Sequence, residues 1–121
     1  MANEIQISAS LNISKNGATF TGTGTINVTQ SGNPSIANLQ AVGTTTEALS
    51  IGDITAVGYV FLKNIDATNF VQVGLATPVT DADAMITLLP GEFALFPTRL
   101  ETIYAKANTA SCNVLVVAGS L

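Results

Sequence analysis

The chain has 121 residues, of which 47% are hydrophobic and only 10% are charged, and its formal net charge is −4 at pH 7. This length suits one domain, so residues 1–121 are expected to form a single unit with a packed core. The four Lys and Arg side chains are too few and too scattered for a nucleic-acid surface that works by counterion release. No apolar run approaches the ~18 residues of a membrane-spanning helix, so neither nucleic acid nor a membrane is expected as a partner.

The first predicted element is a long hairpin over residues 4–29. Residues 4–14 alternate strictly between apolar and polar side chains, and the alternation resumes after Asn16-Gly17. An Asn-Gly pair between alternating runs is typical of a two-residue type I′ turn, because both turn residues need positive φ. Each strand has about eleven residues, roughly twice the usual length.

A two-residue turn also fixes the register of the hairpin. The predicted pairs are Lys15–Ala18, Ile13–Phe20, Leu11–Gly22, Ala9–Gly24, Ile7–Ile26 and Ile5–Val28. They place the apolar side chains on one face and Ser, Thr, Asn and Gln on the other. Gly22 and Gly24 then form a dent for a bulky neighbour, or mark a bend or bulge.

The hairpin carries no charge between Glu4 and Lys15. Natural sheets commonly guard their exposed edges with Lys, Pro or bulges. The edges of this hairpin are therefore expected to be paired inside the domain or covered by another chain. We take the hairpin as the candidate arm that reaches a neighbouring subunit.

Two further strands are predicted before the middle of the chain. Residues 36–46 (IANLQAVGTTT) read as a strand broken at Gly43, and residues 47–51 (EALSI) as a short strand. A helix over 36–46 is the weaker alternative, because Val42, Gly43 and three threonines disfavour it.

Residues 59–74 (YVFLKNIDATNFVQVG) are predicted to form a central hairpin. Two apolar runs with period 2, at 59–62 and 70–73, flank a polar connector at 63–69 that contains Asn and Asp. The runs are apolar on both faces near their middle. A strand of that kind lies between two layers, so this hairpin is expected at the centre of the fold.

The rest of the chain continues as short strands. They are predicted at 84–89, 93–96, 103–107 and 112–118, with a type II turn at Leu89-Pro90-Gly91-Glu92. The aromatic side chains, Phe61 and Phe93 among them, are mostly explained by core positions in strands. Roughly eight to ten antiparallel strands at ~8–12-residue spacing predict an all-β fold, either a β-sandwich or a jelly roll.

The sequence contains few residues that could form a catalytic site. The chain has no His, so the usual general base and the Ser-His and Cys-His pairs are excluded. Cys112 is the only cysteine and lies in an apolar alternation, where an inert packed thiol is expected. Asp81 and Asp83 could supply oxygens to calcium, but the rest of an EF-hand is missing, so a solvated loop is expected. We therefore expect no enzyme, no cofactor and no metal.

Four stretches in a fixed order resemble the small virion structural proteins of tailed bacteriophages. They are GTTTEALSIGDI, GYVFLKNIDATNFVQVG, LLPGEFALFP and IYAKANTASCNVLVV, and they follow the alternating N-terminal hairpin. The resemblance covers nearly the whole chain, and the order of the blocks carries it. It implies a head decoration (cement) protein on the capsid surface of the virion, made in the host cytoplasm. It also implies a homotrimer that binds the major capsid protein.

The candidate oligomer or capsid interface is the apolar face of the N-terminal hairpin. Its residues are Ile5, Ile7, Leu11, Ile13, Phe20, Ile26 and Val28. The alternative function is a ligand- or receptor-binding β-sandwich module of a phage tail or fibre. In that case the loops at 64–69 and 77–83 would carry the site.

Overall fold

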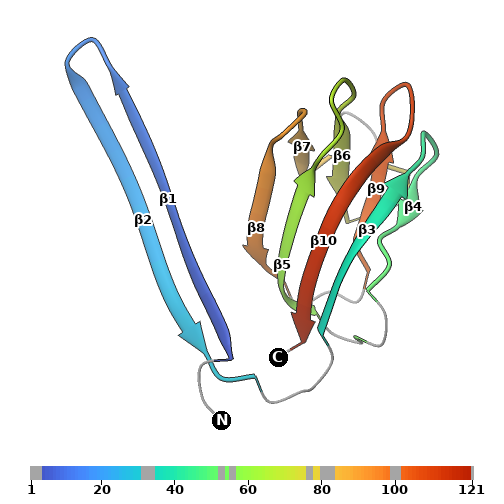
Figure 1. Cartoon of the computed structure of the whole chain (residues 1–121), viewed down its shortest axis with the longest axis horizontal. Coiled ribbons are helices and arrows are strands. Elements are labelled where there is room, and N and C mark those ends of the chain that lie inside the picture. Colours follow the sequence, from blue (N-terminus) through green and yellow to red (C-terminus); the bar gives the residue numbers. More distant parts are fainter. Residues whose placement is uncertain are drawn as a thin grey trace. The chain divides into compact units, whose positions relative to one another are not determined.

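The computed structural model describes residues 4–30, 35–51, 54, 57–75, 78–79, 84–98 and 102–120. These residues form ten strands and no helix, with every strand pair antiparallel (Figure 1). The predicted all-β fold is therefore confirmed. The chain divides into two compact units, Met1–Ser31 and Gly32–Leu121, so the hairpin is a unit of its own.

The first unit is the N-terminal hairpin of β1 (Ile5–Lys15) and β2 (Ala18–Val28). Its register matches all six pairs predicted from the sequence, from Lys15–Ala18 to Ile5–Val28. Asn16 and Gly17 have φ values of 55° and 81°, the positive values that a type I′ turn requires. At the open end, the Gln30 backbone N–H donates to the Glu4 carboxylate at 3.2 Å.

The second unit contains two four-stranded sheets that pack as a β-sandwich. The first sheet has the order β3-β10-β5-β8 and the second has the order β4-β9-β6-β7. The strands are β3 (Ser35–Val42), β4 (Glu47–Ala48), β5 (Val57–Asn64), β6 (Val71–Gly74), β7 (Ile86–Leu88), β8 (Phe93–Pro97), β9 (Tyr104–Ala107) and β10 (Cys112–Ser120).

The strands of the second unit pair in a nested order. β3 pairs with β10, β4 with β9, β5 with β8, and β6 with β7. Two more pairings, β10 with β5 and β9 with β6, complete the sheets. The first four strands of the second unit therefore pair with its last four strands in reverse order.

The predicted central hairpin at 59–74 is wrong. β5 pairs with β10 and β8, whereas β6 lies in the other sheet between β9 and β7. The connector therefore crosses from one sheet to the other instead of turning back. The backbone N–H groups of Asp66, Thr68 and Asn69 donate to the side chains of Asn64 and Asp66. These N–H groups therefore do not pair β5 with β6.

Other sequence-based boundaries shift by a few residues. The strand predicted at 36–46 ends at Val42, just before Gly43. The strand predicted at 47–51 is reduced to Glu47–Ala48. The predicted type II turn is supported, because Gly91 has φ 84° and the Glu92 N–H donates to the Leu89 carbonyl at 2.9 Å.

The core lies between the two sheets of the second unit. Both sheets contribute fully buried aliphatic side chains, such as Val60 and Leu62 from β5 and Val71 from β6. Cys112 is 0% exposed within this cluster, which confirms its predicted burial. Every buried residue of the cluster lies between Val42 and Ala118.

Candidate assembly surface

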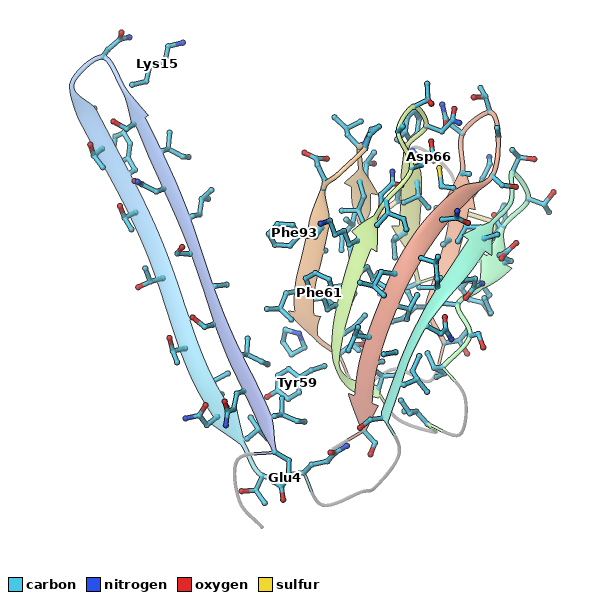
Figure 2. All side chains as sticks on the ribbon, in the orientation of Figure 1. Glu4, Lys15, Tyr59, Phe61, Asp66 and Phe93 are labelled. Carbon is cyan, nitrogen blue, oxygen red and sulfur yellow. The ribbon has the colours of Figure 1, made fainter. Side chains whose placement is uncertain are left out.

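The seven candidate interface residues share one face of the N-terminal hairpin. Four large side chains on this face are highly exposed: Leu11 at 64%, Ile13 at 53%, Phe20 at 67% and Ile26 at 49%. The other three, Ile5, Ile7 and Val28, are partly buried near the open end. Figure 2 labels the two ends of the hairpin, with Glu4 at the open end and Lys15 beside the turn.

A dent interrupts this apolar face near its middle. Gly22 and Gly24 lie opposite Leu11 and Ala9, and a Cβ added at either glycine would meet no atom within 4 Å. The register runs without a shift from one end of the hairpin to the other, so the glycines do not mark a bulge. The dent is therefore open space on a regular sheet.

The opposite face of the hairpin is polar and partly satisfied by cross-strand bonds. The Thr21 hydroxyl donates to the Asn12 side-chain oxygen at 3.1 Å, and the Ser14 and Thr19 hydroxyl oxygens are 3.4 Å apart. Such groups are compatible with water. The hairpin thus has one polar face and one apolar face.

Burial of its apolar face against another surface would stabilise this hairpin. Among the described residues β1 and β2 form a sheet of two strands only, and an isolated two-stranded hairpin is marginally stable in water. Fully burying one large aliphatic or aromatic side chain contributes about 1.5–3 kcal/mol. Covering Leu11, Ile13 and Phe20 would therefore stabilise the hairpin substantially.

A second exposed apolar face lies on the outside of the β3-β10-β5-β8 sheet. Its two central rows are Leu39–Leu115–Lys63–Phe93 and Ala37–Val117–Phe61–Leu95. Leu39 is 55% exposed and Phe93 is 62% exposed. The rings of Phe61 and Phe93 stack with their centroids 5.7 Å apart (Figure 2).

The outer face of the other sheet is different. Its central row is Thr87–Gln72–Lys106, which is a row of polar side chains. A sandwich that stood alone in water would be expected to have two faces of this polar kind. The apolar outer face of the β3-β10-β5-β8 sheet is therefore the unusual one.

Sequence reasoning missed this second face because it placed Phe61 and Phe93 in the core. The sequence of β5 did contain a signal for this face. Both faces of the strand are apolar, so it was expected to lie between two layers. In the structure Val60 and Leu62 face the core, whereas Tyr59 and Phe61 are only half-buried on the other face. Only one of the two expected layers is supplied by the sandwich itself.

The connector proposed as an alternative binding loop is held by its own hydrogen bonds. Asn64 is 0% exposed, and its Nδ2 donates to the Asn69 and Leu88 carbonyls at 2.9 and 3.0 Å. Its Oδ1 accepts the Asp66 N–H at 2.9 Å. The polar atoms of Asn64 are therefore already engaged within the protein.

Asp66 closes the connector in the same way. Its Oδ2 accepts the Asn69 N–H at 2.7 Å and the Thr68 N–H at 2.9 Å. These two backbone donors stabilise the carboxylate and lower the pKa of Asp66 below its ordinary value. Of the second proposed loop, Thr77 and residues 80–83 lie outside the described residues, and with them Asp81 and Asp83.

Cys112 is placed for packing. Its Sγ lies 3.6 Å from the Phe70 carbonyl oxygen. Burial, and to a smaller extent the carboxylate of Asp66, raise the pKa of the Cys112 thiol. The reactive thiolate form is therefore disfavoured.

The described part of the chain contains no group of three or more His, Cys, Asp or Glu side chains that could hold a metal ion. It also contains no helix that is long and apolar enough to cross a membrane. A shallow depression beside β7 and β8 is lined by residues 86–88 and 91–93. Its one carboxylate, Glu92, accepts the Leu89 N–H at 2.8 Å.

Comparison of the chain with protein-family models, with curated proteins and with solved structures found no match. Its function must therefore be argued from its own surfaces, together with the resemblance in the order of its sequence blocks.

Proposed function

We propose that the chain is a non-enzymatic structural protein of a tailed-phage virion. In this role it is a capsid decoration protein that self-associates and stabilises the lattice of the major capsid protein. The observation that carries the proposal is the uncovered apolar face of the hairpin, with Leu11, Ile13 and Phe20 all more than half exposed. A face of this kind marks an interaction site.

The composition of the chain supports an assembly role. Only 10% of its residues are charged, and burying a charge is costly unless it is paired. Interface centres are accordingly depleted of charged side chains. The hairpin face has a single charged position, Lys15, at the tip beside the turn.

The nested strand pairing supports a jelly roll as the finer description of the second unit. In a jelly roll a long hairpin is wound so that its first strands pair with its last ones. The jelly roll occurs in viral capsid and lectin domains among others. Since a fold does not imply a function, this pairing adds to the proposal without carrying it.

The experiment that tests the proposal is binding of the purified chain to capsids of the phage that encodes it. The capsids are prepared without this protein, mixed with it and sedimented. The proposal expects the chain to pellet with the capsids, at a copy number in native virions comparable to that of the major capsid protein. Failure to pellet, with a few copies per virion and binding to host glycans, would favour the tail or fibre module instead.

A further inference from the structure

We infer that the apolar face of the N-terminal hairpin docks onto the apolar outer face of the β3-β10-β5-β8 sheet of a second copy of the chain. The inference rests on the proposed self-association and names the surface that receives the hairpin. The donor face centres on Leu11, Ile13 and Phe20, and the acceptor face on Phe61 and Phe93.

Among the described residues of the second unit, only one face of the acceptor sheet is covered by another sheet. β5 is apolar on both faces, and the sandwich covers only the face that bears Val60 and Leu62. Strands with two apolar faces are normally covered on both sides. The hairpin is a two-stranded sheet with one apolar face of its own, so it can supply the layer that Tyr59 and Phe61 lack.

The hairpin is as long as the acceptor sheet requires. β1 and β2 each have eleven residues and β10 has nine. At about 3.3 Å per residue, these lengths correspond to roughly 36 Å and roughly 30 Å. One hairpin is therefore long enough to cover the sheet along the whole of its longest strand.

The dent on the hairpin face complements a projection on the acceptor face. The dent at Gly22 and Gly24 is open and lies between the bulky pairs Ile13–Phe20 and Ile7–Ile26. The acceptor face carries a projecting aromatic pair, because Phe93 is 62% exposed and stacks on Phe61. The proposed fit places this aromatic pair in the dent, where a flat or bulky hairpin face could not accept it.

The two faces are also compatible in charge. The paired positions of the two faces contain no Asp or Glu, and one Lys each: Lys15 on the hairpin and Lys63 on the sheet. No carboxylate at these paired positions is therefore buried by docking. A lysine can bury its aliphatic stem and still extend its ammonium group to water. Lys15 lies beside the hairpin turn and Lys63 lies one residue before the end of β5, so both ammonium groups can reach water beyond the end of the contact.

The proposed self-association makes a second copy the occupant, because every chain carries both the donor face and the acceptor face. Each copy then gives one hairpin and receives one, so both exposed apolar faces of every chain are covered. Such head-to-tail contacts close into rings when the rotation permits. A ring of three copies agrees with the trimer that the resemblance implies.

The test is complementation between two full-length variants. Ile13→Glu damages only the donor face, and Phe93→Glu damages only the acceptor face; both positions are more than half exposed. We expect the wild-type chain to form an oligomer at micromolar concentration and each variant alone to run at the 12.4 kDa of one chain. An equal mixture is expected to form a 1:1 dimer, because the Phe93→Glu chain offers an intact hairpin and the Ile13→Glu chain offers an intact sheet.

Matched controls place the same charge on the polar faces. Ser14→Glu on the hairpin and Thr87→Glu on the other sheet should leave the oligomer intact. Leu95→Glu, on β8 with Phe93 and paired with Phe61 in the register, should repeat the Phe93→Glu result and guards against a folding defect. Circular dichroism spectra should coincide for all variants.

The inference is overturned by a monomeric wild-type chain, since a hairpin docked within its own chain gives that result. It is also overturned if the mixture stays at the mass of one chain, or if Phe93→Glu and Leu95→Glu keep the oligomer. Binding to capsids is measured separately, as sedimentation of the chain together with the capsids. Loss of pelleting with intact complementation would contradict the capsid role alone, and pelleting without complementation would contradict the docking alone.

Discussion

The Asn64 side chain is hydrogen-bonded to the Leu88 carbonyl, 24 residues further along the chain, with Nδ2 and the oxygen 3.0 Å apart. Asn64 ends β5 in one sheet and Leu88 ends β7 in the other. The backbone of Asn64 also bonds to both Gly91 and Glu92, at 2.9 and 3.0 Å. This buried amide thus ties the two sheets together at one end of the sandwich.

Replacing Asn64 with Leu should destabilise the second unit by about 3 kcal/mol, because it leaves buried carbonyls without donors. The Leu88 carbonyl and the Asp66 N–H would lose their side-chain partners. Urea unfolding followed by circular dichroism measures the change. Asn113→Leu is the control, because Asn113 is exposed on β10, and it should shift the free energy of unfolding by less than about 0.5 kcal/mol. Equal effects of the two substitutions would contradict the role assigned to Asn64.

The pH dependence of stability should contain a contribution from Asp66. Its pKa in the folded protein lies below the ordinary 3.8, so its stabilising effect is fully present above the unfolded-state pKa. The effect is lost as the pH falls through the folded-state pKa. In Asp66→Asn this contribution disappears, because the amide does not titrate in this range.

Urea unfolding from pH 6 down to pH 2 tests that sign. The wild-type chain should exceed Asp66→Asn in stability at pH 6, and the difference should shrink as the pH drops below about 4. A difference that grew on acidification would be inconsistent with the hydrogen bonds from Asn69 and Thr68 that lower the pKa.

The hairpin turn depends on Gly17, whose φ is 81°. Gly17→Ala forces a Cβ into the left-handed region and should cost about 1 kcal/mol. Amide exchange in β1 and β2 should then speed up about fivefold if it follows local opening. Gly22→Ala is the control, because Gly22 has no positive φ and open space for a Cβ. Equally fast exchange in the two variants would argue against a strained turn.

The dent on the hairpin can be filled without touching the turn. Gly24→Leu places a bulky side chain where the docking requires a cavity, although it should strengthen the strand itself. We expect the oligomer to be lost in sedimentation velocity runs. Thr23→Leu adds a large side chain on the opposite face of the same strand and should keep the oligomer. If Gly24→Leu associated as well as the wild-type chain, the dent would have no part in docking.

The N-terminal hairpin could be predicted down to its register because its information is local. Asn16-Gly17 selects the turn, and a two-residue turn leaves one pairing of the flanking alternations. Each predicted pair, such as Ile13–Phe20, is found in the structure. The seven candidate residues therefore also share one face as predicted.

The pairing of β5 could not be predicted in this way. Period-2 alternation identifies a strand without naming its partner, and residues 59–62 and 70–73 alternate equally well. The partners of β5 are β8 and β10, and β10 begins at Cys112. Only tertiary packing decides such long-range pairings, and the same holds for Phe61, whose sequence context did not separate an outer face from the core.

The most direct test of the central claim is the mass in solution of a chain that lacks residues 1–30. The core cluster lies wholly between Val42 and Ala118, so the remaining sandwich should fold and unfold cooperatively. Light scattering at micromolar concentration should then give an oligomer for the full-length chain and a monomer for the truncated one. A truncated chain that still assembled as the full-length chain does would contradict the claim that the N-terminal hairpin holds the copies together.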